Sequence, residues 1–224
     1  MYIEIQALNK SSRLRLKDAV DYRFAARENF CPVFIQELPQ VIREYFVCFP
    51  NNQTDLPHAA LGFEEGVNRY VNEDGVWQAD YIPAFVRRYP FILGRDENKE
   101  GAGNEFTLAV DAKAPHLSTS EGERLFTPDG RPSAALEDRI KLLQAIENER
   151  MITQEAVREL EGRGLFRMQE MTVKAGEQKV AAISGLRMID EDKLRYSELK
   201  PGPALQIVYA HLFSRANLGY GVLT

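Results

Sequence analysis

The stretch 81–93, YIPAFVRRYPFIL, contains the residue types of a recognition site. The adjacent arginines Arg87 and Arg88 stand between Tyr81 and Tyr89, and Trp77 lies shortly before them. A guanidinium forms paired hydrogen bonds with a carboxylate, and Tyr, Trp and Arg dominate many binding surfaces. We therefore treat these five residues as candidate ligand-binding residues for a carboxylate.

The same stretch also permits a structural interpretation. With an offset of 44 residues, LPQVIREYFVCF (38–49) matches IPAFVRRYPFIL (82–93) at three identical pairs: Pro39 with Pro83, Arg43 with Arg87, and Tyr45 with Tyr89. Each half predicts a short helix followed directly by a strand. Pro90 disfavours a helical Tyr89, so the second helix should end near Arg88. An arginine in the last turn of a helix meets the negative end of the helix dipole. This interaction is sufficient to explain Arg43 and Arg87 without a ligand.

His211 is the weak candidate for catalysis. It lies in PALQIVYAHLFSRANL (203–218), whose apolar positions run nearly all the way round a helix and predict a buried one. An acid–base role would require a partner that the linear sequence does not identify. The alternative is a hydrogen-bonded histidine in the core.

Metal, cofactor and nucleic-acid chemistry are not expected. His58 and His116 have no neighbours at metal-ligand spacing, and GAGNEF (101–106) lacks the pattern of a phosphate loop. The net charge is −5, with no dense basic stretch that would match a phosphate backbone. We expect no cofactor, no metal and no nucleic acid.

The elements that must position these residues indicate an α+β fold. We expect a mainly antiparallel sheet flanked by short helices, then a helical segment, a β-hairpin over 170–189 and a buried C-terminal helix. Ser133 predicts the start of a helix, which we expect to break near MITQ (151–154), where Thr153 can cap a second one. An Asp74–Gly75 turn predicts a hairpin over 67–78. We divide the chain into 1–115 and 116–224, packed as one compact unit.

The chain resembles the SapC family of bacterial proteins in motifs that follow one another along nearly its whole length. They are ALNK (7–10), RLRL (13–16), DYRFAARENFCPVFIQELP (21–39), DGVWQADYIPAFVRRYPF (74–91), SEGERLFTPDGRPS (120–133), GLRMIDEDKL (185–194) and YAHLFS (209–214). No single motif defines a chemistry, but their order and spacing are specific.

The resemblance implies a link to a bacterial surface layer and no defining enzymatic activity. Relatives are sometimes labelled as peptide-transport components, and they tend to be encoded near tryptophan-halogenase-like flavoproteins and TonB-dependent receptors. The resemblance thus implies an accessory role in nutrient uptake, peptide modification or the envelope.

We expect a non-catalytic accessory or binding protein that recognises a peptide, a small acid or a partner protein. An enzyme using His211 and a structural surface-layer protein are the alternatives. The longest apolar run, LQIVYAHLF, is about half the length of a membrane span, and the first residues lack a secretory pattern. We therefore expect a cytoplasmic location, with signal-independent export not excluded. The oligomeric state is left open.

Overall fold

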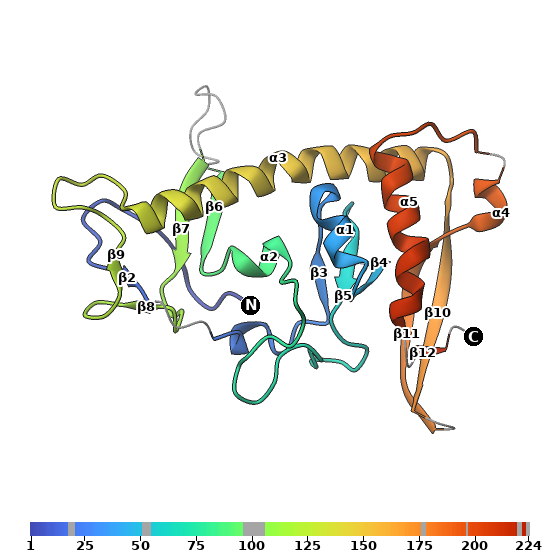
Figure 1. Cartoon of the computed structure of the whole chain (residues 1–224), viewed down its shortest axis with the longest axis horizontal. Coiled ribbons are helices and arrows are strands. Elements are labelled where there is room, and N and C mark those ends of the chain that lie inside the picture. Colours follow the sequence, from blue (N-terminus) through green and yellow to red (C-terminus); the bar gives the residue numbers. More distant parts are fainter. Residues whose placement is uncertain are drawn as a thin grey trace.

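Antiparallel sheets and one long helix organise the chain, as the computed structural model in Figure 1 shows. The structure describes residues 1–17, 21–50, 55–95, 106–175, 178–195, 197–218 and 221–222. The helices are α1 (Leu38–Val41), α2 (Ala84–Arg87), α3 (Ala134–Gly162), α4 (Glu191–Leu194) and α5 (Pro203–Ser214). Short 3₁₀ helices lie at Arg23–Ala25, Ile35–Glu37 and Arg215–Leu218. The predicted α+β class is confirmed.

The strands form three sheets in the described part of the chain, and all their pairings are antiparallel. The six-stranded sheet has the order β12 (Gly221–Val222), β10 (Phe166–Ala175), β11 (Gln178–Ile189), β4 (Phe46–Pro50), β5 (His58–Ala60) and β3 (Phe30–Pro32). A second sheet has the order β1 (Ile5–Ala7), β7 (Phe106–Asp111) and β6 (Phe91–Arg95). The third has the order β8 (Leu117–Ser118), β2 (Arg15–Leu16) and β9 (Glu123–Arg124).

The long helix α3 connects the two larger sheets. It runs along one side of the molecule, contacts β6 and α2 towards one end and packs against α5 towards the other (Figure 1). The predicted cap is present, because the Ser133 hydroxyl accepts a hydrogen bond from the Leu136 backbone N–H (3.3 Å). The helix contributes side chains from both of its ends to the core, so it also fixes the distance between the sheets.

The predicted break near residues 151–154 is wrong, because α3 is continuous over 29 residues. Thr153 does not cap a second helix. Its hydroxyl donates to the Glu149 carbonyl oxygen one turn earlier (2.7 Å) and accepts from the Ile35 backbone N–H (3.2 Å). A threonine can satisfy its hydroxyl in this way inside a helix. Ile152 is exposed rather than packed as a staple.

Replacing Thr153 by valine should therefore lower the free energy of unfolding by about 1–3 kcal/mol, because the half-buried Ile35 N–H would lose its acceptor beside the buried Thr153. Thr153→Ser keeps the hydroxyl and should cost less. Urea denaturation of the two variants measures the difference. Equal stability of the valine and serine variants would remove the proposed link between α3 and the segment at Ile35.

Both predicted helix-to-strand corners are formed. α1 precedes β4 in the six-stranded sheet, and α2 precedes β6 in the three-stranded sheet. The helix α2 ends at Arg87 with Arg88 as its cap, close to the predicted end. The equivalent tyrosines, Tyr45 and Tyr89, are both buried. Whether the two corners are copies of one unit, and whether 1–115 and 116–224 are separate units, stay predictions.

Two other local predictions need correction. The predicted hairpin over 67–78 is a turn with one isolated bridge, Val71 to Trp77, in which Gly75 has a positive φ of 79°. The C-terminal helix α5 is present, but its burial is limited to one face. Tyr209 and Phe213 are 49% and 65% exposed and their rings stack at 5.7 Å. An apolar sequence all round the helix therefore did not mean burial all round it.

Candidate functional site

The main candidate site is a cavity of about 450 Å³ beside α2, which we call the Arg87 cavity. It lies between α2, the first turns of α3 and segments next to β2 and β8. Its lining residues are Leu16, Lys17, Tyr22, Phe24, Val86, Arg87, Tyr89, His116, Ala135, Asp138, Arg139 and Leu142. Residues from both halves of the chain therefore build it, and no single stretch of sequence contains it.

Three cations converge on this cavity. Arg87 is the last residue of α2, Arg139 lies in the second turn of α3, and Lys17 directly follows β2. Arg139 Nη1 donates to the Arg87 carbonyl oxygen (3.3 Å), which connects the two helices at this point. Among the lining residues that the structure describes, Asp138 is the one acidic side chain. The cavity therefore carries an excess of positive charge in a chain whose net charge is −5, and an excess of this sign favours an anionic ligand.

Hydrogen bonds hold the Arg87 side chain in place. Its Nε donates to the Ile82 carbonyl oxygen (2.9 Å), and its Nη2 donates to the Tyr81 hydroxyl (3.2 Å). The Tyr81 hydroxyl donates to Glu37 Oε2 (2.7 Å). Two of the five guanidinium donors are used in this way, which leaves others for a ligand.

Aromatic rings form the inner part of the Arg87 cavity. The rings of Phe24 and Tyr89 are stacked at 3.9 Å and 12°, and the His116 ring meets both edge-on, at 5.5 and 5.3 Å. The Tyr89 hydroxyl donates to Asp111 Oδ2 (3.0 Å), so it is fixed by a buried carboxylate. Tyr89 and His116 are buried, whereas Arg87 and Asp138 are exposed. Arg87 and Asp138 therefore lie nearer the solvent than Tyr89 and His116, whereas Lys17 and Arg139 are half-buried, as Tyr22 and Phe24 are.

His116 is the most unusual residue of the cavity. The residue is 8% exposed, and its Nδ1 has no hydrogen-bond partner among the described residues. Burial lowers the pKa of His116; Asp21 acts in the opposite direction, and Lys17 and Arg139 lower it further. The ring is therefore neutral at pH 7 and carries one donor nitrogen and one acceptor nitrogen.

A smaller cavity of about 230 Å³ lies on the other side of Arg87 and shares that residue with the first. Its walls include Tyr81 and the buried carboxylate of Glu37. Glu37 accepts three hydrogen bonds, from Phe34 N–H (3.0 Å), Ala84 N–H (2.8 Å) and the Tyr81 hydroxyl. Burial raises the pKa of Glu37, and these three donors act against that rise. Glu37 is thus a structural residue that joins the segment before α1 to the start of α2.

Two of the five predicted binding residues, Arg87 and Tyr89, line the Arg87 cavity, and Tyr81 lines the smaller cavity beside it. Trp77 is 7% exposed, and its Nε1 donates to the Tyr45 hydroxyl (2.9 Å). The Arg88 guanidinium lies over the Phe85 ring at 3.6 Å. Neither Trp77 nor Arg88 is among the described residues that line these two cavities. Trp77 is therefore buried away from both cavities and supports the site from the core.

His211 lies away from the Arg87 cavity, on the buried face of α5. It is fully buried; its Nδ1 lies 2.7 Å from the Val47 carbonyl oxygen, and its Nε2 accepts from Ile189 N–H (3.4 Å). Burial lowers the pKa of His211 to about 4. Ser214 adds a second connection, since its hydroxyl accepts from Val47 N–H (2.9 Å). These contacts give His211 a structural role between α5, β4 and β11 and leave its nitrogens engaged with backbone groups.

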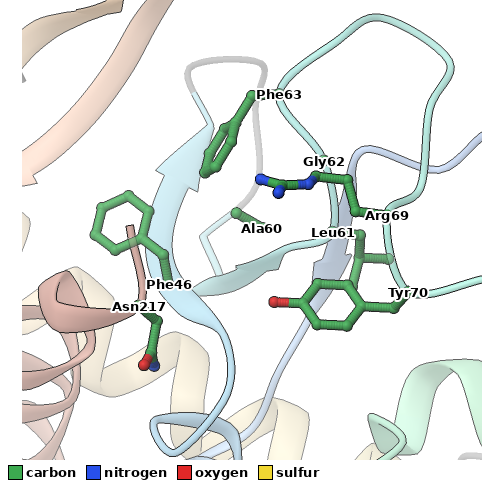
Figure 2. A pocket seen from close by; sticks show the side chains of 8 residues that line it. All are labelled: Phe46, Ala60, Leu61, Gly62, Phe63, Arg69, Tyr70 and Asn217. Atoms are coloured by element: carbon green, nitrogen blue, oxygen red, sulfur yellow. The ribbon is translucent and has the colours of Figure 1, made fainter. Parts of the chain in front are cut away.

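A third cavity, of about 240 Å³, lies at β4 and β5 and is shown in Figure 2. Apolar side chains, among them Phe46, Leu61 and Phe63, form most of its wall, and Arg69 extends over it (Figure 2). The Tyr70 hydroxyl donates to the Glu44 carbonyl oxygen (2.8 Å), and Asn217 Nδ2 donates to two backbone carbonyl oxygens. We call it the Arg69 cavity. Its described lining residues include one cation, whereas those of the Arg87 cavity include three, so it is the weaker candidate for an anion.

Sequence reasoning missed most of the Arg87 cavity. Tyr22 and Phe24 lie in the DYRFAARENF stretch, and alternate aromatics next to a charged run are a signal that could have identified them. Lys17, His116 and Arg139 lie in three segments far apart in the sequence. The pairing of β2 with β8 and the packing of α3 against α2 bring these segments together.

The comparison with family models identifies the class of protein. The model of the SapC family matches residues 9–219, which is nearly the whole chain. The chain therefore belongs to the SapC family. Comparisons with curated proteins and with solved structures found no significant match. Among the described residues, none of the helices combines the length and the apolar character needed to cross a membrane.

Proposed function

We propose that this SapC-family protein is a non-catalytic binding module that holds the carboxylate of a small acid or of a peptide in the Arg87 cavity. The observation that carries the proposal is the convergence of Lys17, Arg87 and Arg139 on one aromatic-lined cavity in an acidic chain. Guanidinium groups pair with a carboxylate through charge-assisted hydrogen bonds, which are about twice as strong as neutral ones. The aromatic wall would supply the apolar contact that a small ligand needs.

The other predicted binding residues take supporting roles in this proposal. Tyr81 holds the Arg87 guanidinium through its hydroxyl. Trp77 stacks edge-on with Tyr22 (5.5 Å), and Tyr22 lines the cavity. Arg88 packs on Phe85 and orders the end of α2. An enzymatic role for His211 is not part of the proposal, because both ring nitrogens contact backbone groups in the core.

The accessory roles implied by the family, in nutrient uptake, peptide modification or the envelope, all require recognition of another molecule. A carboxylate-binding cavity would serve the first two directly, because peptides and many nutrients end in a carboxylate. No observation among the described residues favours an ordered surface layer over these roles, so we do not propose that role.

Phenylacetate is a suitable probe, since it combines one carboxylate with one ring. In a titration followed by protein NMR, the wild-type protein should bind phenylacetate with a Kd of roughly 1 mM or lower. Arg87→Gln/Arg139→Gln should weaken binding at least about 10-fold, because it removes two of the three cations. The effect should shrink as salt is added.

Arg43→Gln is the matched control. Arg43 takes the position equivalent to Arg87 in the first helix-to-strand corner, is exposed, and lines none of the three cavities described above. Its Kd for phenylacetate should equal that of the wild type. Equal weakening by Arg43→Gln and by the double variant would show a general charge effect and would contradict the proposal, as would unchanged binding in the double variant.

A further inference from the structure

We infer that the acid held in the Arg87 cavity is aromatic and carries a hydrogen-bonding group on its ring, which pairs with the imidazole of His116. This inference rests on the function proposed above and specifies the class of ligand. Three observations carry it: the different burial of the arginines and of two rings in the cavity, the geometry of the rings, and the unpartnered nitrogen of His116.

The most exposed lining residues of the cavity are charged, and its two buried rings are Tyr89 and His116. Arg87 is exposed and Arg139 half-buried, whereas Tyr89 and His116 are buried. A ligand whose carboxylate meets the guanidinium groups reaches apolar contact when the rest of its body is directed towards Tyr89 and His116. A purely polar acid such as a short hydroxy acid would leave this inner surface without a partner.

The inner surface is organised for a ring. Phe24 and Tyr89 are parallel, the His116 ring stands edge-on to both, and Tyr22 lies next to Phe24 with its ring centroid at 6.1 Å. Rings at these angles offer both faces and edges, and aromatic pairs of this kind are stabilised beyond the effect of buried area. An aromatic ligand should therefore bind more tightly than a saturated ring of the same size.

His116 then defines the polar group of the ligand. Its Nδ1 is buried without a partner among the described residues, although buried polar atoms are generally hydrogen-bonded. A half-turn of the imidazole about its Cβ–Cγ bond exchanges the places of Nδ1 and Cδ2, so a nitrogen can turn towards a bound molecule. Since His116 lines the cavity and the residue is 92% buried, a hydroxyl or amino group of the ligand is a suitable partner.

The test compares acids of equal charge in the same NMR titration: cyclohexylacetate, phenylacetate and the three hydroxyphenylacetates. Phenylacetate should bind about 2- to 10-fold more tightly than cyclohexylacetate. At least one hydroxyphenylacetate should gain a further factor of about 3 to 10. His116→Phe should remove this second gain, so that no hydroxyphenylacetate binds this variant more tightly than phenylacetate does.

The outcomes separate the inference from the function it rests on. Equal binding of cyclohexylacetate and phenylacetate overturns the inference, while loss of both in Arg87→Gln/Arg139→Gln would still support the proposed function. Binding of none of the acids overturns both. If His116→Phe does not fold, the imidazole ¹⁵N chemical shifts of His116 in the wild-type protein provide the test. A shift change on adding the preferred hydroxyphenylacetate, but not on adding phenylacetate, supports the pairing. No shift change with the hydroxyphenylacetate overturns the pairing.

Discussion

Replacing Glu37 by leucine is expected to lower the free energy of unfolding by about 3–6 kcal/mol. The carboxylate is 7% exposed and accepts from Phe34 N–H, Ala84 N–H and the Tyr81 hydroxyl. Each buried donor left without an acceptor costs about 1–3 kcal/mol. The loss should be visible in urea denaturation at pH 7.

Glu37→Gln provides the matched comparison for this expectation. Glutamine has almost the same shape as glutamate but one acceptor oxygen in place of two, so it can accept from some of the three donors. The glutamine variant should therefore lose less stability than the leucine variant. Because Tyr81 holds Arg87, the leucine variant should also weaken phenylacetate binding in any molecules that remain folded. A leucine variant within about 1 kcal/mol of the wild type would mean that Glu37 does not join the two corners energetically.

Acidification from pH 7 to pH 5 is expected to remove about 4 kcal/mol of stability through two buried histidines. Burial lowers the pKa of both His58 and His211 from 6.5 to about 4. A base whose folded-state pKa is lowered contributes stability that is present above 6.5 and is lost as the pH falls towards 4, because the unfolded chain binds the protons first. At pH 5 the expected loss is about 2 kcal/mol for each histidine.

Single histidine variants show how much of this loss of stability each histidine causes. His211→Asn removes one titrating group, so its stability should fall by about 2 kcal/mol less than that of the wild type between pH 7 and pH 5. His58→Asn should behave in the same way. The raised pKa of Glu37 has the opposite effect on the pH dependence, but it is common to all these proteins and cancels in the comparison. Identical pH profiles of wild type and both variants would show that the two histidines are not held neutral by the fold.

Sequence patterns predicted the features that are set by neighbouring residues. The corners at 38–49 and 82–93, the cap at Ser133 and the hairpin of β10 and β11 follow from local residue types, and the structure forms them. The errors have a common cause. Thr153 has the character of a cap in the sequence, but its partner is Ile35, which lies more than a hundred residues earlier. The exposed face of α5 is just as apolar as its buried face, so composition alone could not separate them.

The candidate site was less predictable than the fold. Arg87 and Tyr89 could be selected because they stand together in one stretch. Lys17, His116 and Arg139 reach the same cavity from three separate segments, and no local pattern connects segments so far apart in the sequence. Trp77 shows the reverse situation: its residue type favours a binding surface, yet its indole N–H is bonded to the Tyr45 hydroxyl in the core.

The most direct test of the central claim is a crystal structure of the protein with 4-bromophenylacetate, in which the anomalous signal of bromine locates the ligand. We predict bromine in the Arg87 cavity among Phe24, Tyr89 and His116, and the carboxylate within hydrogen-bond distance of Arg87 or Arg139. Bromine in the Arg69 cavity, or at no ordered position in crystals of a protein that binds the compound in solution, would contradict the account.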